Sequence, residues 1–107
     1  MRAAAQSAVK DPARAARVGK GIDALAADIA ALETAVGAMR VSLRRLNAAP
    51  DTRPEDILGY LDGFDARRRD IRASLLNHHF ELLAATTADE WTHLAPHERK
   101  VLSASVR

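Results

Sequence analysis

Four histidines are the side chains in this chain best suited to chemistry: His78, His79, His93 and His97. Imidazole is a common ligand for nickel, cobalt, copper and zinc, so we predict these four residues as a candidate divalent-metal site. His93 and His97 have the spacing of one helical face, but Pro96 between them is expected to break that helix. His78 and His79 are adjacent and point about 100° apart on a helix, so at most one easily joins a shared site. The alternative is that these histidines pack against neighbours or face solvent.

Arginines form two basic clusters along the chain: Arg40, Arg44 and Arg45, then Arg67, Arg68, Arg69 and Arg72. Such clusters can bind a phosphate backbone or an acidic polypeptide. Acidic residues interleave with them, and no aromatic side chains accompany them for base stacking. Lys and Arg total 16 against 14 Asp and Glu, which is too even a balance for a typical nucleic-acid domain. We therefore expect solvated helix surfaces with cross-helix ion pairs, such as Arg72 with Asp28, and rank nucleic acid as the third candidate partner.

Nothing in the sequence predicts an enzyme. The serines lack a surrounding motif, no glycine-rich phosphate loop occurs, and the carboxylates are scattered. The absence of cysteine excludes disulfides and thiolate metal sites. No apolar run approaches the roughly 20 residues of a membrane span, and the first residues lack a signal-peptide core. We expect a cytoplasmic protein, or one whose signal or anchor has been removed.

A heptad pattern predicts the main structural element. Its apolar residues, the apolar seam, are separated alternately by four and three positions: Val18, Ile22, Leu25, Ile29, Leu32, Val36, Met39, Leu43 and Leu46. This spacing is typical of a coiled-coil helix, which we predict over residues 12–47, starting at the cap Asp11. Gly19 and Gly21 mark a kink, a weaker portion, or a place where another segment comes close.

A second helix is predicted over residues 54–85, after a proline-containing turn in which Thr52 and Glu55 form a capping box. Two long helices joined by a short turn form an antiparallel hairpin. A capping box of Thr87 and Glu90 begins a short helical tail over 87–107, interrupted at Pro96, and residues 1–11 are expected to form a flexible arm. The predicted fold is a single all-α domain: a long, coiled-coil-like antiparallel helical hairpin with a short C-terminal helical tail.

The seam also permits self-association, because β-branched residues in one register and Leu in the other suit a parallel dimer. We therefore expect a homodimer. Further apolar and basic residues outside the seam are predicted to bind protein: Leu58, Arg68, Arg69, Arg72, Leu76, Phe80, Leu83 and Trp91.

Two stretches of the tail resemble a family motif. Thr86-Thr87-Ala88-Asp89-Glu90 is similar to the L-T-x-x-Q motif of Spy/CpxP-like periplasmic proteins and related heavy-metal-resistance sensors. Leu94-Ala95-Pro96-His97-Glu98-Arg99 is similar to its L-T-P-E-Q-R form. The chain departs from the motif at four positions, where Thr replaces Leu, Ala replaces Thr and Glu twice replaces Gln: Thr86, Ala95, Glu90 and Glu98.

The resemblance implies a periplasmic, dimeric, non-enzymatic helical-hairpin protein of an envelope stress response. Such a protein binds a polypeptide client or a membrane-bound regulatory partner, or senses a divalent metal, here Ni, Co, Cu or Zn. No metal ligand of the family can be carried over to a particular residue of this chain. The alternative function is a cytoplasmic coiled-coil adaptor that uses the seam for partner choice.

Overall fold

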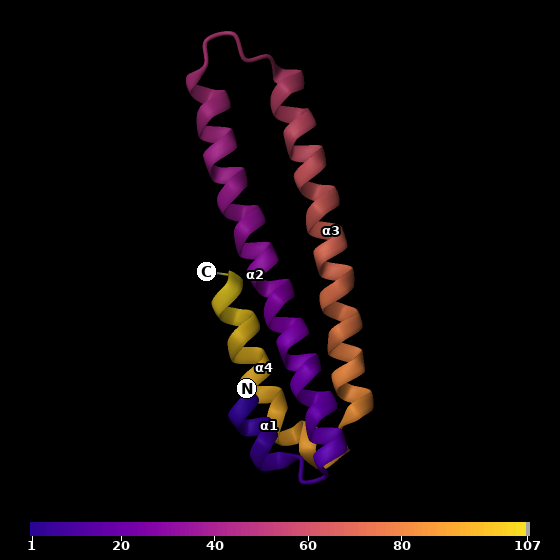
Figure 1. Ribbon diagram of the computed structural model, residues 1–107. Coiled ribbons are helices and arrows are strands. Elements are labelled where there is room, and N and C mark those ends of the chain that lie inside the picture. Colours follow the sequence, from indigo (N-terminus) through magenta and orange to yellow (C-terminus); the bar gives the residue numbers. More distant parts are fainter. Residues whose placement is uncertain (107) are drawn as a thin grey trace.

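The computed structural model describes residues 1–106. In this range the chain folds into α-helices alone: α1 (Arg2–Ala8), α2 (Pro12–Ala48), α3 (Pro54–Ala85) and α4 (Ala88–Val106). The long helices α2 and α3 form an antiparallel hairpin, and α1 and α4 lie beside the half of α2 that is remote from the turn (Figure 1). The molecule measures 60 × 19 × 18 Å. The predicted all-α hairpin is confirmed.

The start of α2 follows the local sequence. The Asp11 carboxylate accepts a hydrogen bond from the Ala13 N–H at 3.1 Å, which satisfies one of the free amides in the first turn. Pro12 occupies the first helical position, where its missing N–H has no consequence. The helix ends at Ala48, one residue beyond the predicted end.

The predicted start of α3 at Pro54 is confirmed, but its predicted capping box is wrong by one residue. Because Pro54 takes the first helical position, Arg53 becomes the N-cap rather than Thr52. The Asp56 carboxylate, not that of Glu55, accepts a hydrogen bond from the Arg53 N–H at 3.0 Å.

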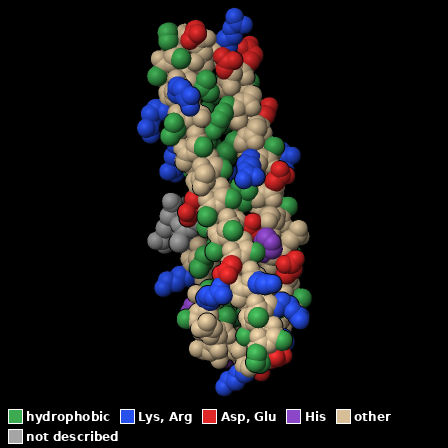
Figure 2. Space-filling view, in the orientation of Figure 1, with side chains coloured by type: hydrophobic (Ala, Val, Ile, Leu, Met, Phe, Trp, Pro, Cys, Tyr) green, Lys and Arg blue, Asp and Glu red, His purple; other side chains and the backbone are tan. Residues whose placement is uncertain are grey.

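The apolar seam is buried over only half its length. Near the open end of the hairpin its residues are at most 7% exposed and pack with Leu82 and Leu94: Val18, Ile22, Leu25 and Ile29. Toward the turn the remaining five, from Leu32 to Leu46, are only half-buried. Green hydrophobic side chains are visible along the junction of the two helices there (Figure 2). The difference arises because α1 and α4 cover only the half of the hairpin remote from the turn (Figure 1).

The expectation of a flexible arm over residues 1–11 is corrected. Residues 2–8 form helix α1, which packs against α2 and α4. Ala5 is 3% and Val9 2% exposed, and Arg2 reaches across to Asp23 at 2.5 Å. The alanine-rich sequence has good helix propensity, but seven residues are too few for a stable isolated helix, so packing supplies the stability.

The expected break at Pro96 is also wrong, since α4 runs continuously from Ala88 to Val106 with Pro96 inside it. Pro96 cannot donate to the Thr92 carbonyl, but both residues are exposed, so water can satisfy that carbonyl. The tail is therefore one helix. None of the helices in the described range is both long and apolar enough to cross a membrane.

Candidate functional site

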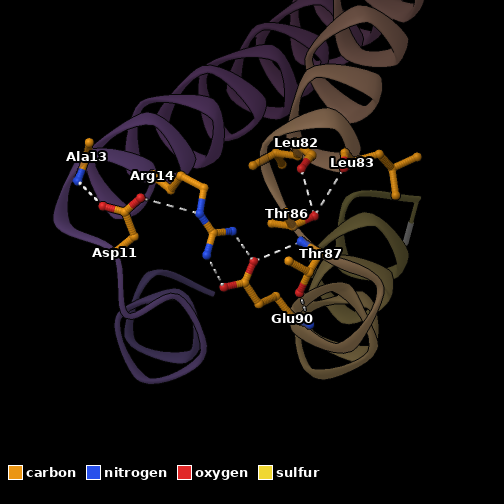
Figure 3. Close-up of polar contacts among 8 residues, drawn as sticks. All are labelled: Asp11, Ala13, Arg14, Leu82, Leu83, Thr86, Thr87 and Glu90. Atoms are coloured by element: carbon orange, nitrogen blue, oxygen red, sulfur yellow. Dashed lines mark hydrogen bonds and ion pairs between the residues drawn. The ribbon is translucent and has the colours of Figure 1, made fainter.

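Helix α4 is attached to α2 by a contact between Arg14 and Glu90. Arg14 Nη1 and Nη2 donate to the two carboxylate oxygens of Glu90 at 2.5 and 3.0 Å (Figure 3). Glu90 also accepts from the Thr87 N–H at 2.8 Å, and the Glu90 N–H donates to the Thr87 hydroxyl at 3.2 Å. The predicted capping box of Thr87 and Glu90 is confirmed. The Arg14 hydrogen bonds lower the pKa of Glu90 below its ordinary value.

A second buried carboxylate attaches α4 to α3. Glu98 is 5% exposed, and its oxygens lie 2.8 and 2.9 Å from Nδ1 of His79. Leu94, midway between Glu90 and Glu98, is fully buried in the core. Because these three residues are spaced by four along a continuous helix, they share one face, and that face packs on the hairpin.

A polar cluster joins α2 to α3 at the middle of the hairpin. Asp28 accepts a hydrogen bond from the Ser74 hydroxyl at 2.8 Å and lies 2.5 Å from Nδ1 of His78. The predicted pair of Asp28 with Arg72 is therefore wrong, because the true helix register places Ser74 and His78 against that carboxylate. Arg68 pairs within its own helix with Asp65 at 3.6 Å.

The structure separates the four histidines that the sequence suggested as a metal site. His78 and His79 face different helices, where each contacts a carboxylate. His93 and His97 instead line a shallow cavity of about 450 Å³ between α4 and α1. Within the described range, no group of three or more His, Asp or Glu side chains is arranged to hold a metal ion. The continuity of α4 does, however, place His93 and His97 one turn apart on one face.

Most of the predicted protein-binding residues of α3 lie on its outer surface. Leu76 is 47% and Phe80 61% exposed, and Leu83 continues the same face as a half-buried residue. The His79 ring meets both Phe80 and Trp91 edge-on, at centroid distances of 5.3 and 5.4 Å, and thereby links α3 to α4. We call Leu76, Phe80, Leu83 and Trp91 the Phe80 patch.

The other predicted residues relate to this patch in two ways. Arg72 and Arg69 are exposed and lie one and two turns, respectively, before Leu76 on the same helix, so they border the Phe80 patch. Leu58 is 60% exposed but belongs to the start of α3, about 27 Å from Leu76 along the helix. Leu58 is therefore outside the patch.

Sequence reasoning missed two grooves between α2 and α3. The upper groove, near the turn, has a volume of about 730 Å³ and is lined mainly by small residues: Ala27, Ala30, Ala31, Thr34, Ala35, Ala38, Gly59, Tyr60, Gly63, Phe64 and Arg67. The lower groove, of about 510 Å³, includes Arg17, Lys20 and Ala24 of α2 with Glu81 of α3. The alanines at helical spacing and the Gly59-x-x-x-Gly63 pattern were the available signal.

No family model, curated protein or solved structure matches this chain.

Proposed function

We propose that this protein is a non-enzymatic binding protein that holds apolar, acidic polypeptide segments on the Phe80 patch. The observation that carries the proposal is the 61% exposure of Phe80, a side chain that folding alone would favour burying. Leu76 extends the apolar surface along α3, and Trp91 of α4 meets the same His79 ring as Phe80. Aromatic side chains bordered by arginine are the composition typical of protein-binding sites.

The chemistry of the patch supports a particular kind of ligand. Covering an exposed Leu or Phe side chain gains about 1.5–3 kcal/mol, before the entropy of ordering the ligand is subtracted. Arg69 and Arg72 border the patch and attract carboxylates, which favours acidic segments and speeds their association. A ligand with Leu or Phe spaced along one helical face and Glu at its ends meets both requirements.

The experiment is a fluorescence anisotropy titration with a labelled 15–20-residue amphipathic peptide that carries Leu and Glu. We expect saturable binding to the wild-type protein and at least about tenfold weaker binding to Leu76→Ser/Phe80→Ser, the loss of about 1.4 kcal/mol. Val41→Ser is the matched control, because Val41 is a 57% exposed hydrophobic residue of α2 outside the patch. Equal affinity for all three proteins would contradict the proposal.

Metal binding is the second candidate function, and one observation favours it. The continuous α4 places the imidazoles of His93 and His97 one turn apart, where two nitrogens can share one Ni, Co, Cu or Zn ion. Calorimetric titration of the metal-stripped protein tests this candidate. Metal binding that disappears in His93→Ala but persists in His79→Ala supports this candidate. The absence of a binding signal with all four metals contradicts it.

We further propose, from the family resemblance, that the protein acts in the bacterial periplasm. The competing proposal is a coiled-coil adaptor in the cytoplasm. Fractionation of cells that express the native gene, followed by immunodetection in each compartment, separates the two.

A further inference from the structure

We propose that the groove-bearing face of the hairpin is a homodimer interface, on which a second copy packs with its long helices parallel to those of the first. This face is formed by α2 and α3 and is separate from the Phe80 patch, so the inference goes beyond the proposed function. Four observations carry it: two glycines without a role in the monomer, a complementary row of alanines, the charges on the two walls, and the area available.

Gly59 and Gly63 lie one turn apart on the α3 wall of the upper groove. A Cβ atom added at either position would meet nothing within 4 Å. Each glycine in a helix interior costs about 0.8–1 kcal/mol relative to Ala, and no contact within one copy explains that cost. Glycines at this spacing allow two helices to approach closely, which gives both positions a purpose if another helix packs on them.

The α2 wall of the groove presents small residues at helical spacing, among them Ala31, Ala35 and Ala38. A two-fold axis parallel to the hairpin places α2 of one copy against α3 of the other at the same height. Because Gly21 lies against Leu82 and Asp28 against Ser74, Ala38 is at nearly the same height as Gly63 and then faces the partner's Gly63. Small residues therefore meet at this height, and Tyr60 and Phe64 of the α3 wall become covered.

The charges on the lower groove select the same arrangement. Its α2 wall carries Arg17 and Lys20, and its α3 wall carries Glu81 at the same height. In the parallel dimer, Lys20 of each copy therefore meets the partner's Glu81. In an antiparallel dimer α2 would lie on the partner's α2, so Lys20 would not meet the partner's Glu81. The parallel arrangement is favoured because it alone pairs these opposite charges.

The area is adequate for a stable dimer. The two grooves extend from Arg17 to Ala38 on α2, which is about 32 Å of helix. Two neighbouring helices, each about 10 Å wide, give a face of about 640 Å² over this length. That projected area is close to the roughly 800 Å² of accessible surface that each partner buries in a standard stable interface.

The test is sedimentation equilibrium of the wild-type protein and of variants that fill the groove. We expect a wild-type dimer, and a monomer for Gly59→Leu/Gly63→Leu, with unchanged helix content by circular dichroism. Gly37→Leu is the matched control, because Gly37 also has open space around it but lies outside both grooves. That variant should remain dimeric. A monomeric wild type, or a dimeric double variant, overturns the proposal.

A charge exchange keeps the proposal testable if the groove-filling variant does not fold. Lys20→Glu and Glu81→Lys should each raise the dimer dissociation constant about tenfold, and the combined variant should restore it. Orientation is tested by spin labels on Asp51→Cys, a unique cysteine at the turn of the hairpin. A short distance between the two labels supports the parallel dimer. A distance approaching the length of the hairpin, or no restoration in the combined variant, overturns it.

Discussion

Arg14 of α2 and Glu90 of α4 meet through two nitrogen–oxygen contacts, at 2.5 and 3.0 Å, although 76 residues separate them in the sequence. The same Glu90 carboxylate caps the start of its own helix through the Thr87 N–H. One side chain thus both starts α4 and attaches it to the hairpin. Because α4 carries Trp91, this contact also fixes one side of the Phe80 patch.

Acid should weaken this contact in a predictable pH range. The pKa of Glu90 is lowered from its ordinary value of 4.5, so the carboxylate form is favoured in the folded protein. Its contribution to stability is complete above that ordinary value and is lost as the pH falls through the lowered pKa. Urea unfolding as a function of pH should therefore show a loss of stability below pH 4.5 that is smaller in Glu90→Gln. An identical pH dependence in the two proteins would contradict this role for Glu90.

Leu94 should contribute strongly to the free energy of unfolding, because it packs α4 against the hairpin. Its side chain is fully buried between the two carboxylates, so Leu94→Ala leaves a cavity and should lower the free energy of unfolding by about 2–5 kcal/mol. Leu58→Ala is the control, because Leu58 is 60% exposed and its loss should change stability by less than about 0.5 kcal/mol. Denaturant titration measures both, and similar values for the two variants would argue against the packing described.

Gly21 and Gly37 should respond oppositely to the same substitution. A Cβ atom at Gly21 would lie 2.9 Å from Cδ2 and 3.1 Å from Cγ of Leu82, a core side chain that is 1% exposed. Gly21→Ala should therefore destabilise the fold by about 1–3 kcal/mol through overpacking. Gly37→Ala, with open space around it, should stabilise it by up to about 1 kcal/mol through helix propensity. Stabilisation by both substitutions would show that Leu82 does not approach Gly21 this closely.

The contribution of the Asp28 polar cluster to the stability of the hairpin should also be measurable. Asp28→Ala leaves Ser74 and His78 without their shared acceptor in a partly buried place, and should cost about 1–3 kcal/mol. Asp65→Ala removes the exposed pair with Arg68 and should change stability by less than about 1 kcal/mol. Thermal unfolding of the two variants gives the comparison. Equal losses would mean that Asp28 does not hold the helices together.

The hairpin could be predicted from the sequence because its signals are local. The seam spacing defines α2, and Asp11, Pro12 and Pro54 define where the long helices begin. The sequence offers a close approach of another segment as one explanation for Gly19 and Gly21, and the structure places Leu82 against Gly21.

The remaining features depend on contacts between distant segments. Helix α1 is too short to form alone, so its formation follows from the burial of Ala5 and Val9 by α2 and α4. The continuity of α4 depends on whether Pro96 faces solvent. Simple pairing about the turn predicts a different register of α2 against α3 from the one observed. In the observed register Asp28 contacts His78 rather than Arg72. The surfaces left uncovered depend on where α4 ends, which no local pattern encodes.

The most direct test of the proposed function uses Trp91, the only tryptophan in the chain and a member of the Phe80 patch. Its emission is followed while the wild-type protein is titrated with a tryptophan-free amphipathic peptide that carries Leu and Glu. We predict a saturable blue shift that is lost in Phe80→Ser and weakened by Arg69→Ala/Arg72→Ala, because the peptide covers the indole and its carboxylates meet the arginines. Unchanged emission up to millimolar peptide would contradict the assignment of this patch as a polypeptide-binding site.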